Sequence, residues 1–193
     1  LKLAINLRRC AGLLVWLKKF NRIQKMKILV LDNYDSFTYN LVHIIRALGY
    51  DPDIYRNDQI SVEKVAQYDR ILLSPGPGVP DEAGIMKSVI HQLGPTHSIL
   101  GVCLGLQGIA EVYGGKLFNM KDVLHGVTSE LSIVDGEDYL FKGLPSNFRI
   151  THYHSWAVDR THESKDLKIT AFNSNGIIMA MSHKLFNVRG VQS

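Results

Sequence analysis

The sequence predicts an α/β fold, in which a doubly wound, mostly parallel β-sheet carries extra β strands in the C-terminal half of the chain. Three observations lead to this prediction. Short apolar runs of strand length recur up to residue 102, and segments with the apolar spacing of helices separate them. After Gly115, short β-like segments follow one another with little helix between them. Strands that alternate with helices are joined by right-handed crossovers, which build a parallel sheet.

The elements of the first half follow in order from residue 27. The apolar runs KILVLD, RILLS and SILGV are typical of parallel strands that are covered on both faces, and DIYR is a shorter strand. In the first predicted helix, Asp35 or Ser36 can cap the start and Gly49 can end it. The predicted strands are therefore 27–32, 53–56, 70–74 and 98–102, and the predicted helices are 37–49, 61–68, 84–93 and 104–113.

The second half adds strands to the same sheet. Short β segments are predicted at 126–134, 148–155, 167–173 and 176–182, and we expect them to extend and cover one end of the sheet. Neither an internal repeat nor a linker interrupts the pattern. We therefore expect one domain over residues 26–193, preceded by a basic N-terminal extension, residues 1–25, outside the fold.

Charge is distributed unevenly along the chain. Residues 1–25 carry seven Lys and Arg and no acid, so the remaining chain has a net charge of −3 although the whole chain has +4. We therefore expect no nucleic-acid partner. Residues 1–25 could be a signal peptide, although a clear cleavage site is absent, or a targeting or membrane-surface helix. As a transmembrane helix the apolar stretch is too short, since about 20 residues are needed. The favoured interpretation is sequence upstream of a start at Met26, because a strand begins directly after Met26 and Leu1 is not a natural start.

The two cysteines, Cys10 and Cys103, lie far apart in different contexts. This usage favours reduced thiols and a cytoplasmic protein. We also expect no membrane partner. Cys103 stands in GVCLG (101–105), which has the strand–turn–helix order of a nucleophile elbow. The alternative is a buried structural cysteine at a strand end. The flanking glycines favour the nucleophile, since they would allow a sharp turn.

A helix that begins at Leu104 would act on the Cys103 sulfur in two ways. Its N-terminal dipole would lower the thiol pKa, and the backbone N–H of Leu104 would be ready to receive an oxyanion. An oxyanion hole needs a second donor from a neighbouring loop. SPGPG (74–78) is either an ordinary turn or a stiff loop that aims a backbone N–H, and Gly78 is the candidate donor.

Several motifs in this order and spacing closely resemble the class I glutamine amidotransferases, in particular the small subunits of anthranilate synthase and of aminodeoxychorismate (para-aminobenzoate) synthase. The resemblance covers Met26 to Gln192. The motifs are DNYDSFTYN (32–40), RND (56–58), SPGPGVPDEAG (74–84), GVCLGLQ (101–107), HG-T-S (125, 126, 128 and 129), YHSW (153–156) and RGVQ (189–192).

The resemblance implies a flavodoxin-like glutaminase that passes ammonia to a large chorismate-binding synthase subunit. Cys103 matches the nucleophile that forms a thioester with L-glutamine, and Gly78 and the Leu104 amide match the oxyanion hole. No metal or cofactor is expected in this chain, because any Mg²⁺ belongs to the large subunit. The positions that match the L-glutamine site are Gly76, Pro77, Gly78, Gln107, Ser155 and Trp156.

The chain departs from the family at its last residues. The family's final strand reads GVQFHPES, whose histidine and glutamate complete a Cys-His-Glu triad, whereas this chain reads RGVQS. Truncation or true loss of the segment would explain the difference. We expect the polypeptide as written to be a weak or inactive glutaminase, and His125, His152, His154 and His183 match none of the catalytic positions.

Two alternatives compete with an active glutaminase. A catalytically impaired, glutaminase-like binding protein is supported by the missing His-Glu segment, but the intact elbow, the PGPG loop and Gln107 count against it. A flavodoxin-like redox or phosphate-binding domain fails, because neither loop has a phosphate-cradle pattern and no C-x-x-C is present. The choice between anthranilate and aminodeoxychorismate synthesis stays open, as does the oligomeric state.

Overall fold

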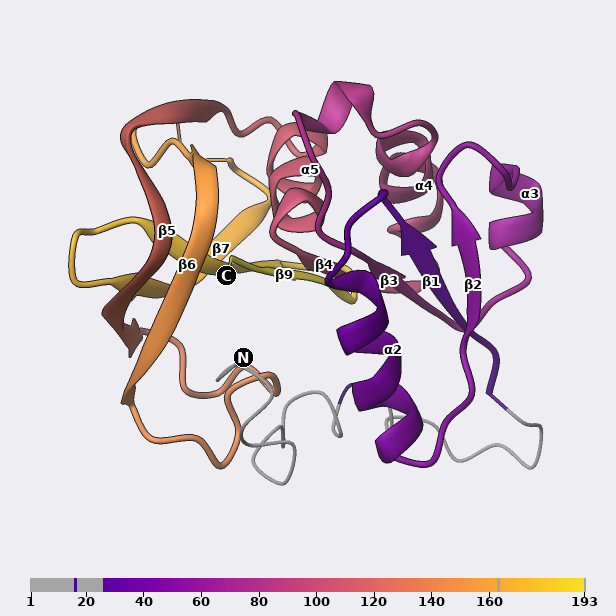
Figure 1. Cartoon of the computed structure of the whole chain (residues 1–193), viewed down its shortest axis with the longest axis horizontal. Helices are drawn as coiled ribbons and strands as arrows, with labels where there is room; N and C mark the ends of the chain where they lie inside the picture. Colours follow the sequence, from indigo (N-terminus) through magenta and orange to yellow (C-terminus); the bar gives the residue numbers. More distant parts are fainter. Residues whose placement is uncertain (1–15, 17–25, 163, 193) are drawn as a thin grey trace.

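The apolar runs of the first half, together with a short strand near the C-terminus, form the parallel part of one nine-stranded sheet, in a computed structural model that describes residues 16, 26–162 and 164–192 (Figure 1). The parallel strands lie in the order β2-β1-β3-β4-β9. Parallel pairing places the carboxyl ends of these strands at one edge of the sheet. Their bounds are β1 Ile28–Asp32, β2 Asp53–Arg56, β3 Arg70–Leu73, β4 Ser98–Val102 and β9 Val188–Val191.

The other β segments of the second half extend this sheet, as predicted, and the structure shows that their pairing is antiparallel. The order continues from β9 as β8-β7-β5-β6. Strand β5 is longer than predicted, with 17 residues, and it pairs with β6 through two irregularities in register, between Asn119 and Leu124 and between His125 and Val127. The bounds are β5 Leu117–Ile133, β6 Asn147–Val158, β7 Leu167–Asn173 and β8 Ile178–His183.

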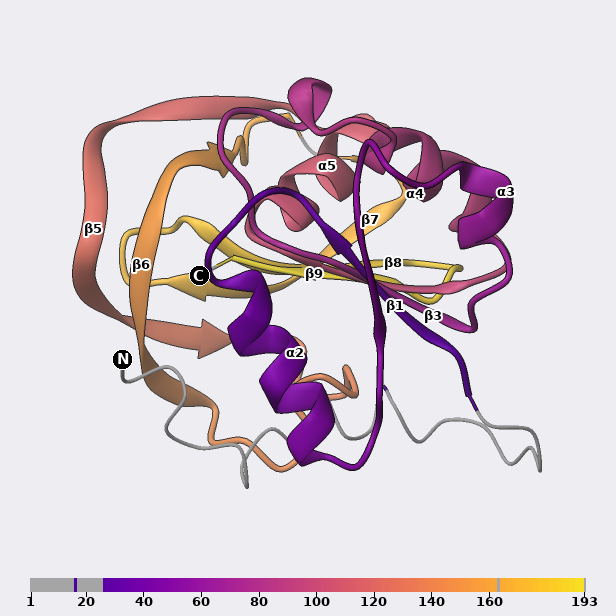
Figure 2. The same cartoon turned by 45° about the vertical axis from the view of Figure 1, so that its right-hand side comes forward.

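Helices cover both faces of the parallel strands (Figures 1 and 2). On one face α3 (Val62–Val65), α4 (Met86–Leu93) and α5 (Leu104–Val112) pack on the largest apolar cluster. On the other face α2 (Thr38–Ala47) packs on a second cluster, which includes Val30 and Leu72. A short 3₁₀ turn, η2 (Pro80–Glu82), precedes α4. The two clusters confirm the doubly wound arrangement, since β1, β3 and β4 are buried on both faces, whereas β2 at the edge is partly exposed.

The start of α2 differs from the prediction. The helix begins at Thr38, and its N-cap residue Phe37 makes no side-chain capping bond. Asp35 Oδ1 accepts the backbone N–H of Phe37 at 2.6 Å, just outside the helix. Asp35 therefore orders the turn before the helix instead of capping it, whereas Gly49, with φ +88°, ends the helix as predicted.

The predicted basic extension, residues 1–25, lies outside the described residues except for Trp16. The Trp16 side chain is 1% exposed and packs in the cluster under α2. Its carbonyl oxygen accepts a hydrogen bond from Arg70 Nε at 3.0 Å, at the start of β3. Across the described ranges, none of the helices has the length and apolar character to span a membrane.

Candidate active site

Cys103 occupies the abrupt turn between β4 and α5. Strand β4 ends at Val102 and α5 begins at Leu104, so Cys103 alone makes the turn, with φ +52° and ψ −104°. Such a conformation in a non-glycine residue costs about 1–3 kcal/mol and persists only where the surroundings impose it. Here the Cys103 N–H donates to the Val191 carbonyl at 2.8 Å, and its carbonyl accepts from the N–H of Gln107 at 3.0 Å. The elbow predicted from GVCLG is therefore present.

The flanking glycines have a different role from the predicted one. Neither Gly101 nor Gly105 has a positive φ, so the sharp turn is made by the cysteine itself. A Cβ at Gly101 would lie 2.4 Å from the carbonyl carbon of Gly105, and a Cβ at Gly105 would lie 2.7 Å from the carbonyl oxygen of Leu73. The glycines therefore let α5 approach the backbones of β4 and β3 directly, which the turn requires.

The Cys103 thiol is half-buried, and its pKa is shifted upward, opposite to the predicted direction. Burial raises the pKa of Cys103 above its usual value, while hydrogen bonds from the Gln192 side chain and the Leu104 backbone oppose the rise. The net direction is upward, because removing the thiolate from water outweighs these two donors. The Leu104 backbone at the start of α5 thus lowers the thiol pKa as expected, but the net shift of the pKa is upward.

Gln192 reaches the thiol because β9 pairs with β4. The parallel register sets Val191 beside Val102, so the next residue of each strand also lies side by side. Gln192 Nε2 donates to Cys103 Sγ at 3.1 Å, and Gln192 Oε1 accepts from Gln107 Nε2 at 3.3 Å. Gln107 Nε2 also donates to the Trp156 carbonyl at 3.2 Å. Gln192 thereby links the Cys103 thiol to Gln107 on α5, and Gln107 links it to Trp156 on β6.

The SPGPG loop is anchored at the carboxyl ends of β1 and β3. The backbone N–H of Asn33 donates to Ser74 Oγ at 2.8 Å, and Asn33 Nδ2 donates to the Ser74 carbonyl at 2.8 Å. A Cβ at Gly76 would lie 2.6 Å from both the Asn33 carbonyl oxygen and Leu104 Cδ2. The loop is therefore pressed between β1 and the first residue of α5.

Gly78 and Leu104 line one pocket of about 320 Å³, together with Pro77 and other residues at the ends of β1 to β3. Gly78 has φ +70°, as the predicted stiff loop requires. Glu82 Oε2 lies where a Cβ of Gly78 would stand and accepts the N–H of Val79 at 3.3 Å. Gly78 and Leu104, the two residues predicted to supply the oxyanion donors, thus line the same pocket, and so does Glu82.

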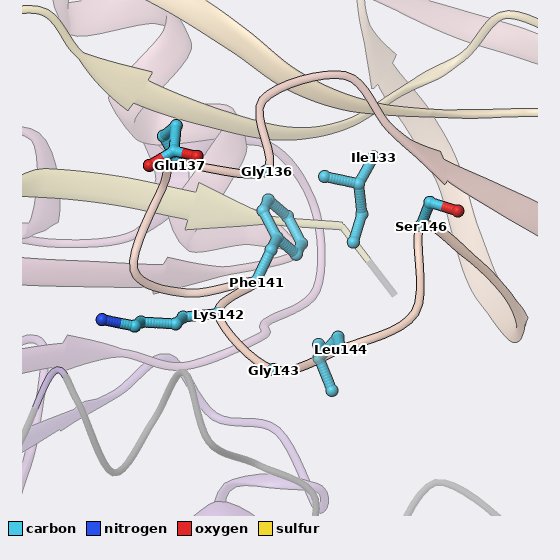
Figure 3. Close-up of a pocket in the computed structure, with 8 residues that line it drawn as sticks. All are labelled: Ile133, Gly136, Glu137, Phe141, Lys142, Gly143, Leu144 and Ser146. Atoms are coloured by element: carbon cyan, nitrogen blue, oxygen red, sulfur yellow. The ribbon is translucent and has the colours of Figure 1, made fainter.

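A second pocket, of about 330 Å³, is formed by the loop that joins β5 to β6 (Figure 3). Its walls include Ile133, Phe141 and Leu144, and none of the residues singled out from the sequence lines it. Size alone therefore does not locate the candidate site. The candidate site is located instead by the contacts around Cys103.

The remaining predicted residues lie on β6, and the residue that the sequence analysis missed directly follows β9. Ser155 is half-buried on β6 beside Trp156. His152 and His154 are buried and hydrogen-bonded to each other, Nδ1 to Nε2, at 3.2 Å. The sequence pattern missed Gln192 as a site residue, because only the pairing of β4 with β9 brings residue 192 to residue 103. The side chain of His125 is not among the side chains that the structure describes.

Comparisons with known proteins agree with this geometry. The family model "Glutamine amidotransferase class-I" matches residues 29–193. "Anthranilate synthase component 2" of Porphyra purpurea is 45% identical over 168 residues, 86% of this chain and 88% of that protein. The protein of the same name from Mycobacterium tuberculosis (strain CDC 1551 / Oshkosh) is 40% identical over 172 residues, 86% of this chain and 73% of that protein.

A solved structure supports the same assignment. The crystal structure of a putative GMP synthase protein from Thermoplasma acidophilum superimposes with a TM-score of 0.77 at 26% identity, and covers 88% of this chain and 84% of that one. The family model spans most of the chain, and both relatives exceed 30% identity. The chain therefore belongs to the class I glutamine amidotransferase family.

Proposed function

We propose that this chain hydrolyses L-glutamine at Cys103 and delivers the ammonia to a large chorismate-using synthase subunit, most directly for anthranilate synthesis. The observation that carries the proposal is the elbow at Cys103, whose thiol is linked through Gln192 to the Gln107 side chain and through that side chain to the Trp156 carbonyl. The anthranilate synthase names of the relatives support the choice of partner. Synthesis of 4-amino-4-deoxychorismate is the other product class that the same ammonia would serve.

The proposed reaction begins at the Cys103 sulfur. The thiolate attacks the side-chain amide carbon of glutamine, and the N–H groups of Gly78 and Leu104 receive the oxyanion. The proton that the thiol gave up passes to the amide nitrogen, the C–N bond breaks, ammonia leaves, and a thioester remains. Water adds to the thioester carbon, the C–S bond breaks, and glutamate is released with the thiol restored.

The proposed glutamine site lies between the SPGPG loop and β6. Gly76, Pro77 and Gly78 would border the side-chain amide, and Gln107, Ser155 and Trp156 would hold the α-carboxylate and α-ammonium groups. An amino-acid ligand needs both donors and acceptors at its polar end. The Gln107 amide, the Ser155 hydroxyl and the Trp156 backbone supply both kinds.

Proton transfer is the step for which the described thiol environment is least suited. The hydrogen bond to Sγ comes from Gln192 Nε2, which donates and has no basic site to take the thiol proton. Burial also raises the thiol pKa. Losing a general base costs about 10²–10⁴-fold in rate. We therefore propose slow turnover for this 193-residue polypeptide, with an impaired binding protein as the second candidate function.

The test combines the full 193-residue chain with chorismate and the large subunit of an anthranilate synthase. Glutamine-dependent formation of anthranilate, followed by its fluorescence, is expected above the level that the large subunit gives by itself. Free ammonia should replace both glutamine and this chain. Cys103→Ser should abolish the glutamine-dependent part only. Binding to the large subunit without any glutamine-dependent product would favour the impaired binding protein, and absence of both would contradict the proposal.

A further inference from the structure

A chain of side-chain hydrogen bonds leads from β5 through two buried histidines toward Cys103. Ser129 Oγ lies 2.5 Å from His152 Nε2, and His152 Nδ1 lies 3.2 Å from His154 Nε2. His154 Nδ1 lies 3.0 Å from the carbonyl oxygen of Trp156. Gln107 Nε2 donates to that same oxygen at 3.2 Å. The Trp156 carbonyl thus joins the histidine pair to the amides around the thiol.

The Trp156 carbonyl oxygen can only accept a hydrogen bond. This determines which atom donates and which accepts in each hydrogen bond of His152 and His154. His154 Nδ1 must therefore carry the hydrogen, and in the neutral ring Nε2 accepts from His152 Nδ1. His152 Nε2 then accepts the hydroxyl hydrogen of Ser129. Both rings are buried, 0% and 4% exposed, and burial lowers the pKa of His152, which favours its neutral form.

The Trp156 carbonyl also determines the orientation of the side-chain amides of Gln107 and Gln192. The Gln107 atom that faces it must be Nε2, whose second N–H goes to Gln192 Oε1. Gln192 Nε2 then faces Cys103 Sγ. With both hydrogens of Gln107 Nε2 engaged, the acceptor Oε1 is the part of that amide left for a ligand N–H group.

We propose that His154 is a positioning residue for the glutamine site, which holds the Trp156 carbonyl so that the Gln107 amide presents its acceptor oxygen to the substrate ammonium group. His152 supports it by fixing its tautomer. This inference rests on the proposed function. The chain of bonds orients groups and does not conduct protons to the thiol, because a backbone carbonyl and two amides interrupt it.

The experiment compares two labelling rates of Cys103, followed by peptide mass mapping, because an iodoacetamide adduct on the second cysteine, Cys10, has the same mass. A chloroketone analogue of L-glutamine needs the substrate site, whereas iodoacetamide needs only the thiol. The ratio of the two rates therefore reports the site and cancels changes in thiol reactivity. His154→Asn keeps an N–H two bonds from Cβ, where Nδ1 stands, and His154→Gln keeps an amide nearer to Nε2 and His152.

The ratio should fall about tenfold in His154→Ala and His154→Gln, as for the loss of one buried hydrogen bond, and stay within about threefold in His154→Asn. His183→Asn is the matched control. Its ring is also buried, but it accepts the N–H groups of Leu185 and Phe186 and takes no part in this chain of bonds. The control ratio should not change. Circular dichroism checks each variant for folding, and the Asn and Gln variants decide the result if His154→Ala does not fold.

Two failures are distinguishable. The positioning role would be overturned if all three His154 variants kept the labelling ratio of the unmodified chain, or if the ratio fell equally in His154→Asn and His154→Gln. In either case L-glutamine would still protect Cys103 in the unmodified chain. Absence of labelling by the chloroketone in the unmodified chain, or labelling that L-glutamine does not slow, would overturn the proposed function together with this inference.

Discussion

The substitution Gly101→Ala tests whether the elbow depends on direct backbone contact between β4 and α5. The added Cβ would lie 2.4 Å from the carbonyl carbon and 2.5 Å from the carbonyl oxygen of Gly105, about 1 Å inside the 3.4 Å at which ordinary contacts begin. Both atoms are backbone atoms in the first turn of α5, so no side-chain rotation relieves the overlap. Helix α5 must shift away from the sheet, and overpacking of this kind costs about 3 kcal/mol.

The expected result is a lower midpoint of thermal unfolding. For a chain of this size, about 3 kcal/mol corresponds to a decrease of about 6–12 °C, measured by circular dichroism. Gly136→Ala is the control, because Gly136 has an ordinary φ and nothing within 4 Å of the added Cβ. Its midpoint should stay within about 2 °C of the unmodified chain. A Gly101→Ala midpoint equally close to that of the unmodified chain would refute the contact argument.

Three further predictions follow from the thiol and from two buried side chains. Gln192→Ala should slow iodoacetamide labelling of Cys103 at pH 8, because the N–H that it removes holds the thiol pKa down; an unchanged rate would contradict the Gln192 contact. The free energy of unfolding should decrease as pH falls below about 6.5, because the unfolded chain then binds a proton that buried His152 resists. Denaturant titrations at pH 7 and pH 5 measure this, and the pH dependence should be weaker in His152→Asn. Trp16→Ala should lower the free energy of unfolding by about 3–5 kcal/mol, whereas an unchanged denaturation midpoint would place Trp16 outside the core.

The spacing of apolar residues located the strands and helices of the first half, because each of them is marked within a short stretch of consecutive residues. The apolar runs around Leu29, Ile71 and Ile99 are confirmed as buried parallel strands, and the elbow at Cys103 follows from five consecutive residues. The full length of β5 was not predictable in this way. Its pairing with β6 skips residues at two places, so no alternation of polar and apolar residues marks it.

The site was predictable only in part, for the same reason. The SPGPG loop and Gln107 carry signals in neighbouring residues, whereas Gln192 reaches the thiol through pairing across 89 residues. The thiol pKa also depends on burial, which sequence spacing does not measure. The positive φ of Cys103 could have been inferred for the elbow, but the close approach of Gly101 to Gly105 requires the packed helix.

The most direct test of the central claim is whether Cys103 reacts as a glutamine-directed nucleophile. The full chain is incubated with the chloroketone analogue of L-glutamine, and its intact mass and peptide map are recorded. The account predicts a single adduct on Cys103 that L-glutamine slows, that L-asparagine does not slow, and that is absent in Cys103→Ser. Adducts elsewhere, or labelling of Cys103 at the same rate with and without L-glutamine, would contradict it.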